Sequence, residues 1–287
     1  MSIQWFPGHM TKARKSIADW MAKTDVVIEV LDARMPRASA NPVVTELRRQ
    51  KPCIKVLNKS DLADPKITEA WLRYFEASSV GGKVLAVALT TSRTAETKKR
   101  IAELSKKLAT HPSGPGKTVR AMIVGIPNVG KSTLINTLMD RKVAKVGDEP
   151  AVTKGTQLVT LKSGMTISDT PGILWPNLED SAISVRLALG GAIPDTVIDY
   201  ETVALFAARF FLERYPEQVM TRYKITKLPE SETALLEEIG RRRGCLKSGG
   251  VVDVHKAADI LVHEFRDGLL GRMSLEVPSS GSVQAAG

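Results

Sequence analysis

Residues 125–133, Gly-Ile-Pro-Asn-Val-Gly-Lys-Ser-Thr, constrain the fold of this chain more than any other stretch. They follow the apolar run 121–124 and precede residues 134–138, which are apolar at helical spacing. In such a strand-to-helix turn, glycines let backbone N–H groups surround phosphate oxygens, and the helix directs its positive end at them. A glycine-rich turn without a ligand is the alternative. The full GxxxxGK[ST] pattern in this context instead predicts a nucleoside triphosphate site, with the fixed positions Gly125, Gly130, Lys131 and Ser132.

Two side chains of this phosphate loop have predicted chemical roles. Lys131 is a predicted catalytic residue that reaches the β- and γ-phosphates, and Ser132 is a predicted ligand of Mg²⁺. The other loop positions that we expect to bind the nucleotide are Asn128, Val129, Gly130 and Thr133.

A second motif indicates which base is bound. Residues 54–57 form a predicted buried strand that ends at Asn58-Lys59-Ser60-Asp61. In an Asn-Lys-x-Asp turn the aspartate accepts hydrogen bonds from the N1–H and exocyclic amine of guanine, which adenine does not offer. Alone, this tetrapeptide would be an ordinary turn or helix cap. In a chain that also has a phosphate loop, Asn58, Lys59 and Asp61 predict guanine binding.

The next predicted strand, residues 84–89, brings a further loop to the base. Ala88 and Leu89 occupy the position where GTPases usually carry Ser-Ala. Because the serine is missing, we expect this part of the base pocket to use backbone groups.

The segment after the phosphate loop contains the predicted switches. Residues 147–156 are polar and lack periodicity, and Thr153 is our choice for the second Mg²⁺-binding hydroxyl and a catalytic group, with Thr156 as the alternative. Residues 169–172, Asp-Thr-Pro-Gly, match the DxxG pattern, although a plain turn is the alternative. Here Asp169 would hold Mg²⁺ through water and the N–H of Gly172 would sense the γ-phosphate.

Hydrolysis needs a group that this half of the chain lacks. Gly172 is followed by Ile173, where many GTPases have a glutamine that orients the attacking water. Either a partner supplies a polar group, or one comes from elsewhere in the chain. His9, in the unusual run Trp5-Phe6-Pro7-Gly8-His9-Met10, is the candidate. The alternative is that His9 caps the helix that follows.

Beyond residue 180 the strand pattern stops. Three apolar stripes at helical spacing predict helices around residues 203–211, 231–244 and 253–265. We therefore predict a GTPase domain over 1–179, a helical RNA- or ribosome-binding domain over 180–273, and a disordered tail over 274–287. Arg241-Arg242-Arg243 at a helix end either complement the helix dipole or contact a polyanion, and we favour the polyanion.

Composition limits the compartment and the partners. Lys and Arg exceed Asp and Glu by 41 to 31, so a polyanionic partner is plausible, but charge alone does not select RNA, DNA or a membrane. Cys53 and Cys245 lack metal-ligand spacing and are interpreted as reduced packing thiols. We find no signal-peptide pattern and no apolar run of membrane-spanning length, and we expect a cytoplasmic location.

The order of the motifs defines the fold class. In most GTPases the phosphate loop comes first, whereas here Asp61 precedes Lys131, so the order is circularly permuted. A doubly wound sheet tolerates this because its sites lie at the carboxyl ends of the strands. We predict an α/β fold with a doubly wound, mostly parallel sheet, the circularly permuted P-loop GTPase domain, followed by a small all-α domain.

The chain resembles the circularly permuted GTPases, and among them those that assist assembly of the bacterial large ribosomal subunit. The resemblance covers nearly the whole chain and is carried by residues 4–10, Asp32-Ala33-Arg34, 58–61, 125–133, 169–176, 243–246 and 248–250. It implies GTP hydrolysis stimulated by the immature 50S subunit, with the C-terminal helices touching rRNA. It also implies that His9 replaces the missing glutamine, and that Asn128 helps to bind K⁺ beside the phosphates.

Further expectations concern partners and competing functions. We expect no DNA partner, no stable membrane association, and a monomer off the ribosome. The alternatives are a tRNA- or membrane-associated regulatory GTPase and a non-hydrolysing RNA-binding scaffold. Absence of an RNA-modifying domain or a lipid-binding stretch argues against the first. Intact Lys131 and Asp169 argue against the second, because a pure binder would not need them.

Overall fold

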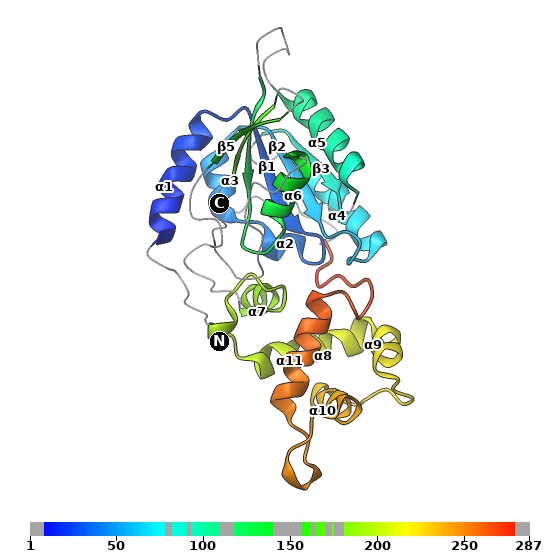
Figure 1. Ribbon diagram of the computed structural model, residues 1–287. Coiled ribbons are helices and arrows are strands. Elements are labelled where there is room, and N and C mark those ends of the chain that lie inside the picture. The colour runs from blue at the N-terminus through cyan, green and yellow to red at the C-terminus, as the bar shows by residue number, and fades with distance from the viewer. Residues whose placement is uncertain are drawn as a thin grey trace.

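The computed structural model describes residues 9–77, 82–90, 93–109, 118–139, 157–161, 165–169, 174 and 181–278, with backbone alone for 9–13, 16, 157–159, 169 and 181. A six-stranded sheet carries helices on both faces, and a second group of helices lies beyond one edge of it (Figure 1). We call this second group, from α7 (Ser181–Leu189) to α11 (Val254–Arg266), the helical unit.

The sheet has the order β3-β2-β1-β4-β6-β5, and every pairing is parallel except that of β5 with β6. The strands are β1 (Val26–Asp32), β2 (Cys53–Asn58), β3 (Val84–Ala88), β4 (Arg120–Val124), β5 (Gln157–Thr160) and β6 (Thr166–Asp169).

Six helices belong to the sheet region: α1 (His9–Ala22), α2 (Pro36–Ser39), α3 (Pro42–Arg48), α4 (Pro65–Ala77), α5 (Thr94–Leu108) and α6 (Lys131–Met139). The helical unit contains α7 (Ser181–Leu189), α8 (Tyr200–Arg214), α9 (Pro216–Tyr223), α10 (Glu232–Arg243) and α11 (Val254–Arg266). Short 3₁₀ turns, η1 (Asp195–Val197) and η2 (Ser248–Gly250), complete the described elements.

The strand order confirms the predicted doubly wound class. The chain first builds outward through β1, β2 and β3, then returns to the middle of the sheet at β4 and builds the other half. The order therefore reverses between β1 and β4. Ligands of such sheets bind at the carboxyl edge beside this reversal. The loop after β1 and the phosphate loop after β4 meet there.

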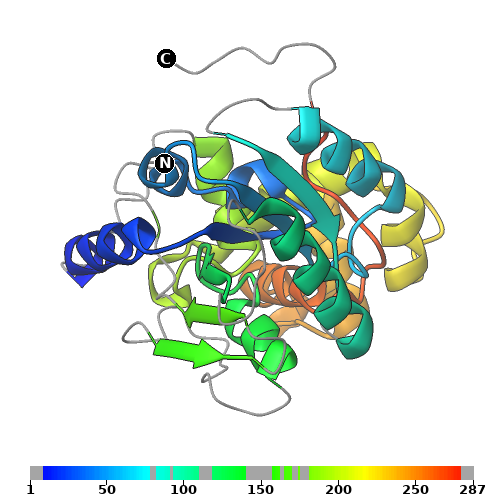
Figure 2. The same ribbon diagram turned by 90° about the horizontal axis from the view of Figure 1, so that it is seen from above.

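Alternation along the strands divides the core between the two faces. In β1, Val26, Ile28 and Val30 pack with the residues of α5 and α6, whereas Val27 and Leu31 pack with those of α1, α3 and α4. Figure 2 shows these helices on either side of the sheet. Both faces are covered, as expected for strands that read as nearly continuous apolar runs.

The helical unit has its own dense centre. Phe211 of α8 is fully buried and lies 5.5 Å from the ring of Phe265 in α11, measured between ring centroids. Predicted helix ends are confirmed: the side chain of Ser231 accepts from Ala234 N, Gly244 adopts a left-handed conformation, and Asp253 caps α11. Both cysteines are buried free thiols, and burial raises the pKa of Cys53 to about 11.

The structure differs from the expected disordered tail over its first residues. Ser274 and Leu275 are 1% exposed, and the chain returns through them to the sheet (Figure 1). Leu275 N donates to Arg34 O, and Trp71 Nε1 donates to Glu276 O. The Glu276 carboxylate accepts from backbone N–H groups at the beginning of α2. Long-range hydrogen bonds thus order a segment whose local composition indicated disorder.

Phe211→Ala tests this packing. We expect the free energy of unfolding to fall by about 3–5 kcal/mol, because the change leaves a cavity at a fully buried position. Phe210→Ala, the same change at the neighbouring and partly exposed side chain, is the control and should cost clearly less. Urea unfolding followed by circular dichroism measures both. Equal losses would show that Phe211 is not a centre of the core.

Candidate functional site

The phosphate loop runs from the end of β4 into α6, as the sequence predicts. Gly130 has φ +93°, and a Cβ there would lie 2.3 Å from Asn58 Nδ2. The position therefore requires glycine both for its conformation and for the close approach of Asn58. Lys131 is 7% exposed, and its ammonium donates to Ile126 O at 2.6 Å, so the cation is held inside the loop.

Asn58 joins the two predicted nucleotide motifs. Its side chain is 3% exposed, and Nδ2 donates to Val129 O at 2.8 Å. A residue predicted to bind the nucleotide thus also holds the phosphate loop against the end of β2. The two motifs are therefore in contact, although these two residues are 71 positions apart in the chain.

The turn after β2 is supported by β3. Lys59 has φ +57°, and Asp61 is exposed at the carboxyl edge of the sheet. Leu89 N donates to Leu57 O at 2.9 Å, and Ser60 N donates to Leu89 O at 3.2 Å. Both backbone groups of Leu89 therefore hold the turn in place, while Ala88 lies partly buried beside it.

Asp32 and Arg34 form a buried ion pair beside this turn. Each side chain is 1% exposed, and Arg34 NH2 and Asp32 Oδ2 are 2.8 Å apart. Lys59 Nζ lies 3.4 Å from the same carboxylate. Burial alone would raise the pKa of Asp32, but the charges and hydrogen bonds of Arg34 and Lys59 outweigh it and hold that pKa well below its ordinary value. Burial lowers the pKa of Lys59, and Asp32 opposes that shift.

Arg34 also binds the end of α11. Its NH1 donates to Phe265 O at 2.8 Å, and its guanidinium carbon lies 4.5 Å from the centre of the Phe265 ring. The last carbonyls of a helix carry partial negative charge, so a cation is favourable there. One arginine thus connects the loop after β1 to the helical unit.

A second route joins the phosphate loop itself to the helical unit. Asn128 Nδ2 donates to Gly191 O at 2.8 Å, directly after α7. Arg266 then binds the same turn, because its Nε donates to Leu189 O and its NH2 donates to Ala188 O. Asn128, which the resemblance assigns to K⁺, is therefore also a contact between the loop and α7.

Sequence reasoning did not assign roles to Asp32, Arg34 and Arg266. The available signal was the pair of charged residues around Ala33, directly after a fully apolar strand end. A charge at that position must be paired or hydrogen-bonded when it is buried. The partner carbonyls on α11 are 231 positions away, beyond the reach of a local pattern.

Several predicted site residues lie outside the description. Thr153, Thr156, Gly172 and Ile173 are among the residues that are not described, as are the side chains of Asp169 and His9. For Asp169 and His9, the structure describes the backbone. Asp169 pairs with Ile123 near the beginning of the phosphate loop, and His9 is the first residue of α1.

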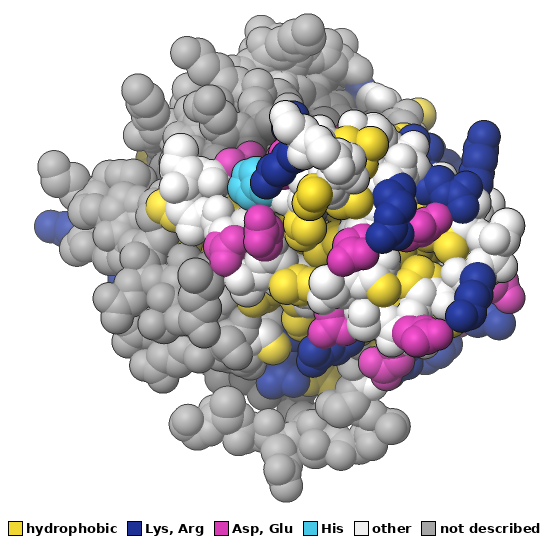
Figure 3. Space-filling model, turned by 90° about the horizontal axis from the view of Figure 1, so that it is seen from below, with side chains coloured by type: hydrophobic (Ala, Val, Ile, Leu, Met, Phe, Trp, Pro, Cys, Tyr) yellow, Lys and Arg dark blue, Asp and Glu magenta, His cyan; other side chains and the backbone are white. Residues whose placement is uncertain are grey.

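The arginines at the end of α10 have carboxylate partners. Arg241 pairs with Glu237 at 2.8 Å, Arg242 with Glu238 at 2.8 Å, and Arg243 with Glu264 of α11 at 2.7 Å. Figure 3 shows basic and acidic side chains interspersed on this face of the helical unit. A polyanion would have to compete with these carboxylates, so the polyanion contact stays a prediction.

Joined guanine and phosphate motifs, in permuted order on a doubly wound sheet, define a circularly permuted P-loop GTPase. A family model described as "50S ribosome-binding GTPase" matches residues 120–205. The chain is 41% identical to ribosome biogenesis GTPase A of Priestia megaterium, with 97% of this chain and 98% of the relative covered. The chain belongs to the ribosome biogenesis GTPase A family.

More distant relatives agree with this assignment. Ribosome biogenesis GTPase A of Thermotoga maritima is 34% identical over 96% of this chain and 95% of the relative. A GDP-bound structure of YlqF from T. maritima matches with a TM-score of 0.63 and 32% identity, over 91% of this chain and 98% of that one. A GNP-bound structure of the same protein matches with a TM-score of 0.63 and 32% identity, over 93% and 98%.

Asp32→Asn tests the buried ion pair. We expect the free energy of unfolding at neutral pH to fall by about 3–5 kcal/mol, because Arg34 would remain buried without a carboxylate. Asp61→Asn makes the same change at an exposed aspartate and should cost less than about 0.5 kcal/mol. Urea unfolding measures both, and equal values would contradict the importance of the pair.

The same variant has a defined pH dependence. The folded-state pKa of Asp32 lies below its ordinary value, so its stabilising contribution is present above the unfolded pKa, near 3.8, and is lost as the pH falls toward the folded one. Wild-type stability should therefore fall more steeply than that of Asp32→Asn between about pH 5 and about pH 3. Parallel curves would contradict this assignment.

Proposed function

We propose that this chain is a GTP-hydrolysing assembly factor that binds the immature large ribosomal subunit and uses hydrolysis as a maturation and release switch. The observation that carries the proposal is the hydrogen bond from Asn128 in the phosphate loop to Gly191 of the helical unit. Through this hydrogen bond, a movement of the phosphate loop on GTP hydrolysis would shift the helical unit, to which we assign ribosome binding. Relatives named ribosome biogenesis GTPase A support ribosome assembly as the process in which the protein acts.

Guanine selection is assigned to Asp61. Its exposed position on a turn held by Leu57 and Leu89 leaves the carboxylate available to the base. Asn58 and Lys59 support the turn and the phosphate loop, and Ala88 and Leu89 lie beside it.

Phosphate and metal binding are assigned to the loop and the switches. Lys131 would exchange the Ile126 carbonyl for phosphate oxygens, while backbone N–H groups of 128–133 surround them. Ser132, in the first turn of α6, suits Mg²⁺, which prefers oxygen ligands and phosphates, with Thr153 and Asp169 as further ligands and Gly172 as the γ-phosphate sensor. K⁺ beside Asn128 belongs to the same proposal.

The partners are the large ribosomal subunit and its rRNA. A formal net charge of +10 favours binding to a polyanion that weakens with salt. None of the helices in the described part of the chain has the length and apolar content needed to cross a bilayer. We further propose that the protein is cytoplasmic and that it is a monomer when it is not bound to the ribosome.

Asp61→Asn should shift the preference from GTP toward xanthosine triphosphate, because the amide then meets a carbonyl where guanine carries its amine. We expect GTP affinity to fall at least about tenfold, since charge-assisted hydrogen bonds are lost. Titration with fluorescent GTP and xanthosine triphosphate analogues measures this. Asp19→Asn, at an exposed position of α1, is the control. Unaltered GTP affinity in Asp61→Asn would remove it as the base reader.

Subunit-stimulated hydrolysis tests the whole proposal. GTP turnover should rise when immature large subunits are added at low salt, and the rise should shrink at high salt. His9→Ala should lower the stimulated rate about a hundredfold with GTP binding nearly intact, and His255→Ala, at an exposed histidine of α11, should not.

Each alternative predicts a different result in this assay. Lack of stimulation would favour the tRNA- or membrane-associated regulatory GTPase. GTP binding without any hydrolysis would favour the scaffold. Equal turnover of His9→Ala and wild type would leave His9 as a helix cap.

A further inference from the structure

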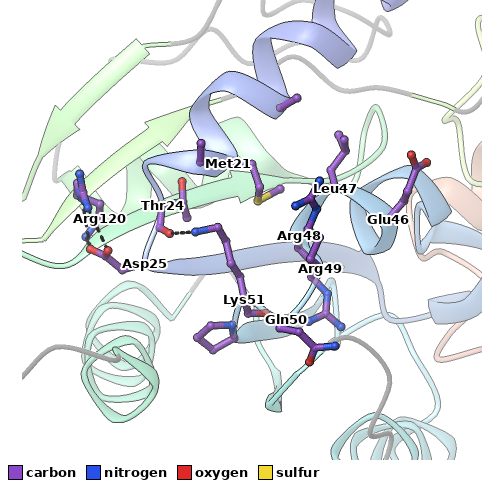
Figure 4. A pocket seen from close by; sticks show the side chains of 13 residues that line it. Met21, Thr24, Asp25, Glu46, Leu47, Arg48, Arg49, Gln50, Lys51 and Arg120 are labelled. Carbon is purple, nitrogen blue, oxygen red and sulfur yellow. Dashed lines mark hydrogen bonds and ion pairs between the residues drawn. The ribbon is translucent and has the colours of Figure 1, made fainter.

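A hollow lies at the opposite edge of the sheet from the phosphate loop. It has a volume of about 870 Å³ and opens between the ends of α1 and α3 and the beginnings of β2 and β4 (Figure 4). The phosphate loop follows the carboxyl end of β4, whereas this hollow contains Arg120, the first residue of that strand. We call it the amino-edge pocket. Its volume suits a ligand of nucleotide size.

The lining combines apolar and cationic side chains. Leu47 and Pro52 supply partly exposed apolar surface, and Arg49 and Lys51 supply accessible positive charge, whereas Met21 and Arg48 are each 2% exposed. Figure 4 shows Met21 and Leu47 at one side of the pocket and Lys51 reaching across it toward Thr24. A ligand that has both a flat apolar part and an anionic part fits this division.

The carboxylates of the lining are already paired. Asp25 pairs with Arg120 at 3.2 Å, and Glu46 pairs with Arg14 at 2.8 Å. The Lys51 ammonium donates instead to a neutral carbonyl, Thr24 O, at 2.8 Å. Positive charge is therefore in excess in this pocket, and an anion is favoured there.

Arg49 adds an independent observation from its backbone. It lies directly after α3 with φ +51° and ψ −117°. For any residue other than glycine, this backbone conformation is strained. The side chain is exposed, and among the described residues it forms no ion pair. Glycine would relieve this strain, so Arg49→Gly removes the guanidinium without adding backbone strain.

We propose that the amino-edge pocket binds one nucleotide of a single-stranded RNA. Arg49 and Lys51 receive the phosphate, and the base lies against Leu47. Unpaired RNA bases can be turned outward and read in this way, whereas paired ones cannot. The proposal deepens the proposed function, on which the presence of an RNA partner rests. It gives the sheet domain an RNA contact separate from the helical unit.

Both ends of the central strands are then in use. Guanine nucleotide binds at the carboxyl edge and RNA at the amino edge, separated by the seven residues of β1, or roughly 20 Å. A variant in the amino-edge pocket should therefore leave GTP binding unchanged, which makes GTP affinity a check on folding.

The test uses the full chain with GDP and a fluorescently labelled octauridine RNA, read by anisotropy over a series of KCl concentrations. Arg49→Gly should weaken RNA binding about tenfold and lower the salt slope by about one. Lys51→Met, which keeps an apolar stem, should do the same. Lys66→Ala, which removes one exposed cation from α4, is the matched control and should change neither.

Position and ligand class are tested in parallel. RNA carrying 4-thiouridine should crosslink within residues 18–25 or 46–52. Crosslinks confined to α10 and α11, or equal RNA affinity in Arg49→Gly and Lys66→Ala, would overturn the proposal. Displacement by uridine monophosphate at the affinity of the octanucleotide would overturn it too, in favour of a free nucleotide. Since no ribosomal subunit is present, failure here is distinct from failure of subunit-stimulated hydrolysis.

Discussion

The buried ion pair between Asp32 and Arg34 sets the relation between the nucleotide site and the helical unit. Two charges that are 1% exposed must satisfy each other, since either alone would be costly in that environment. The carboxylate also holds Lys59 of the turn after β2, and the guanidinium also holds the last carbonyls of α11. The pair therefore fixes two distant parts of the chain relative to the loop after β1.

Two further hydrogen bonds connect these parts at the phosphate loop. Asn58 joins the turn after β2 to the phosphate loop, and Asn128 joins that loop to the turn after α7. Arg266 connects these two contacts. It directly follows Phe265, whose carbonyl Arg34 binds, and its own side chain binds the end of α7. Displacement of the phosphate loop would break hydrogen bonds to buried groups unless the helical unit moved with it. These hydrogen bonds are the physical link between the phosphate loop and the helical unit.

Local patterns predicted most of the nucleotide motifs and little of what joins them. The phosphate loop, the turn ending at Asp61 and the permuted sheet follow from glycine placement, apolar strands and motif order. Arg34 binding to Phe265 O and Leu275 binding to Arg34 O join residues more than 200 positions apart, which no window of sequence reveals. Short helices such as α3, which begins at Pro42 after the Asn41 cap, were also missed, because seven residues are too few to establish a period.

The permuted order of the strands determines where the helical unit contacts the sheet. β1, β2 and β3 come first in the chain, β6 is the last strand among the described residues, and the next described helix is α7. After α11 it comes back, and Leu275 and Glu276 bind the loop after β1 and the beginning of α2. Near the point where the strand order reverses, Asn128 therefore binds the turn after α7, while Arg34 and α2 bind the segment that follows α11. In that geometry the carboxyl edge of the sheet, where the nucleotide motifs lie, is also the edge that holds the helical unit.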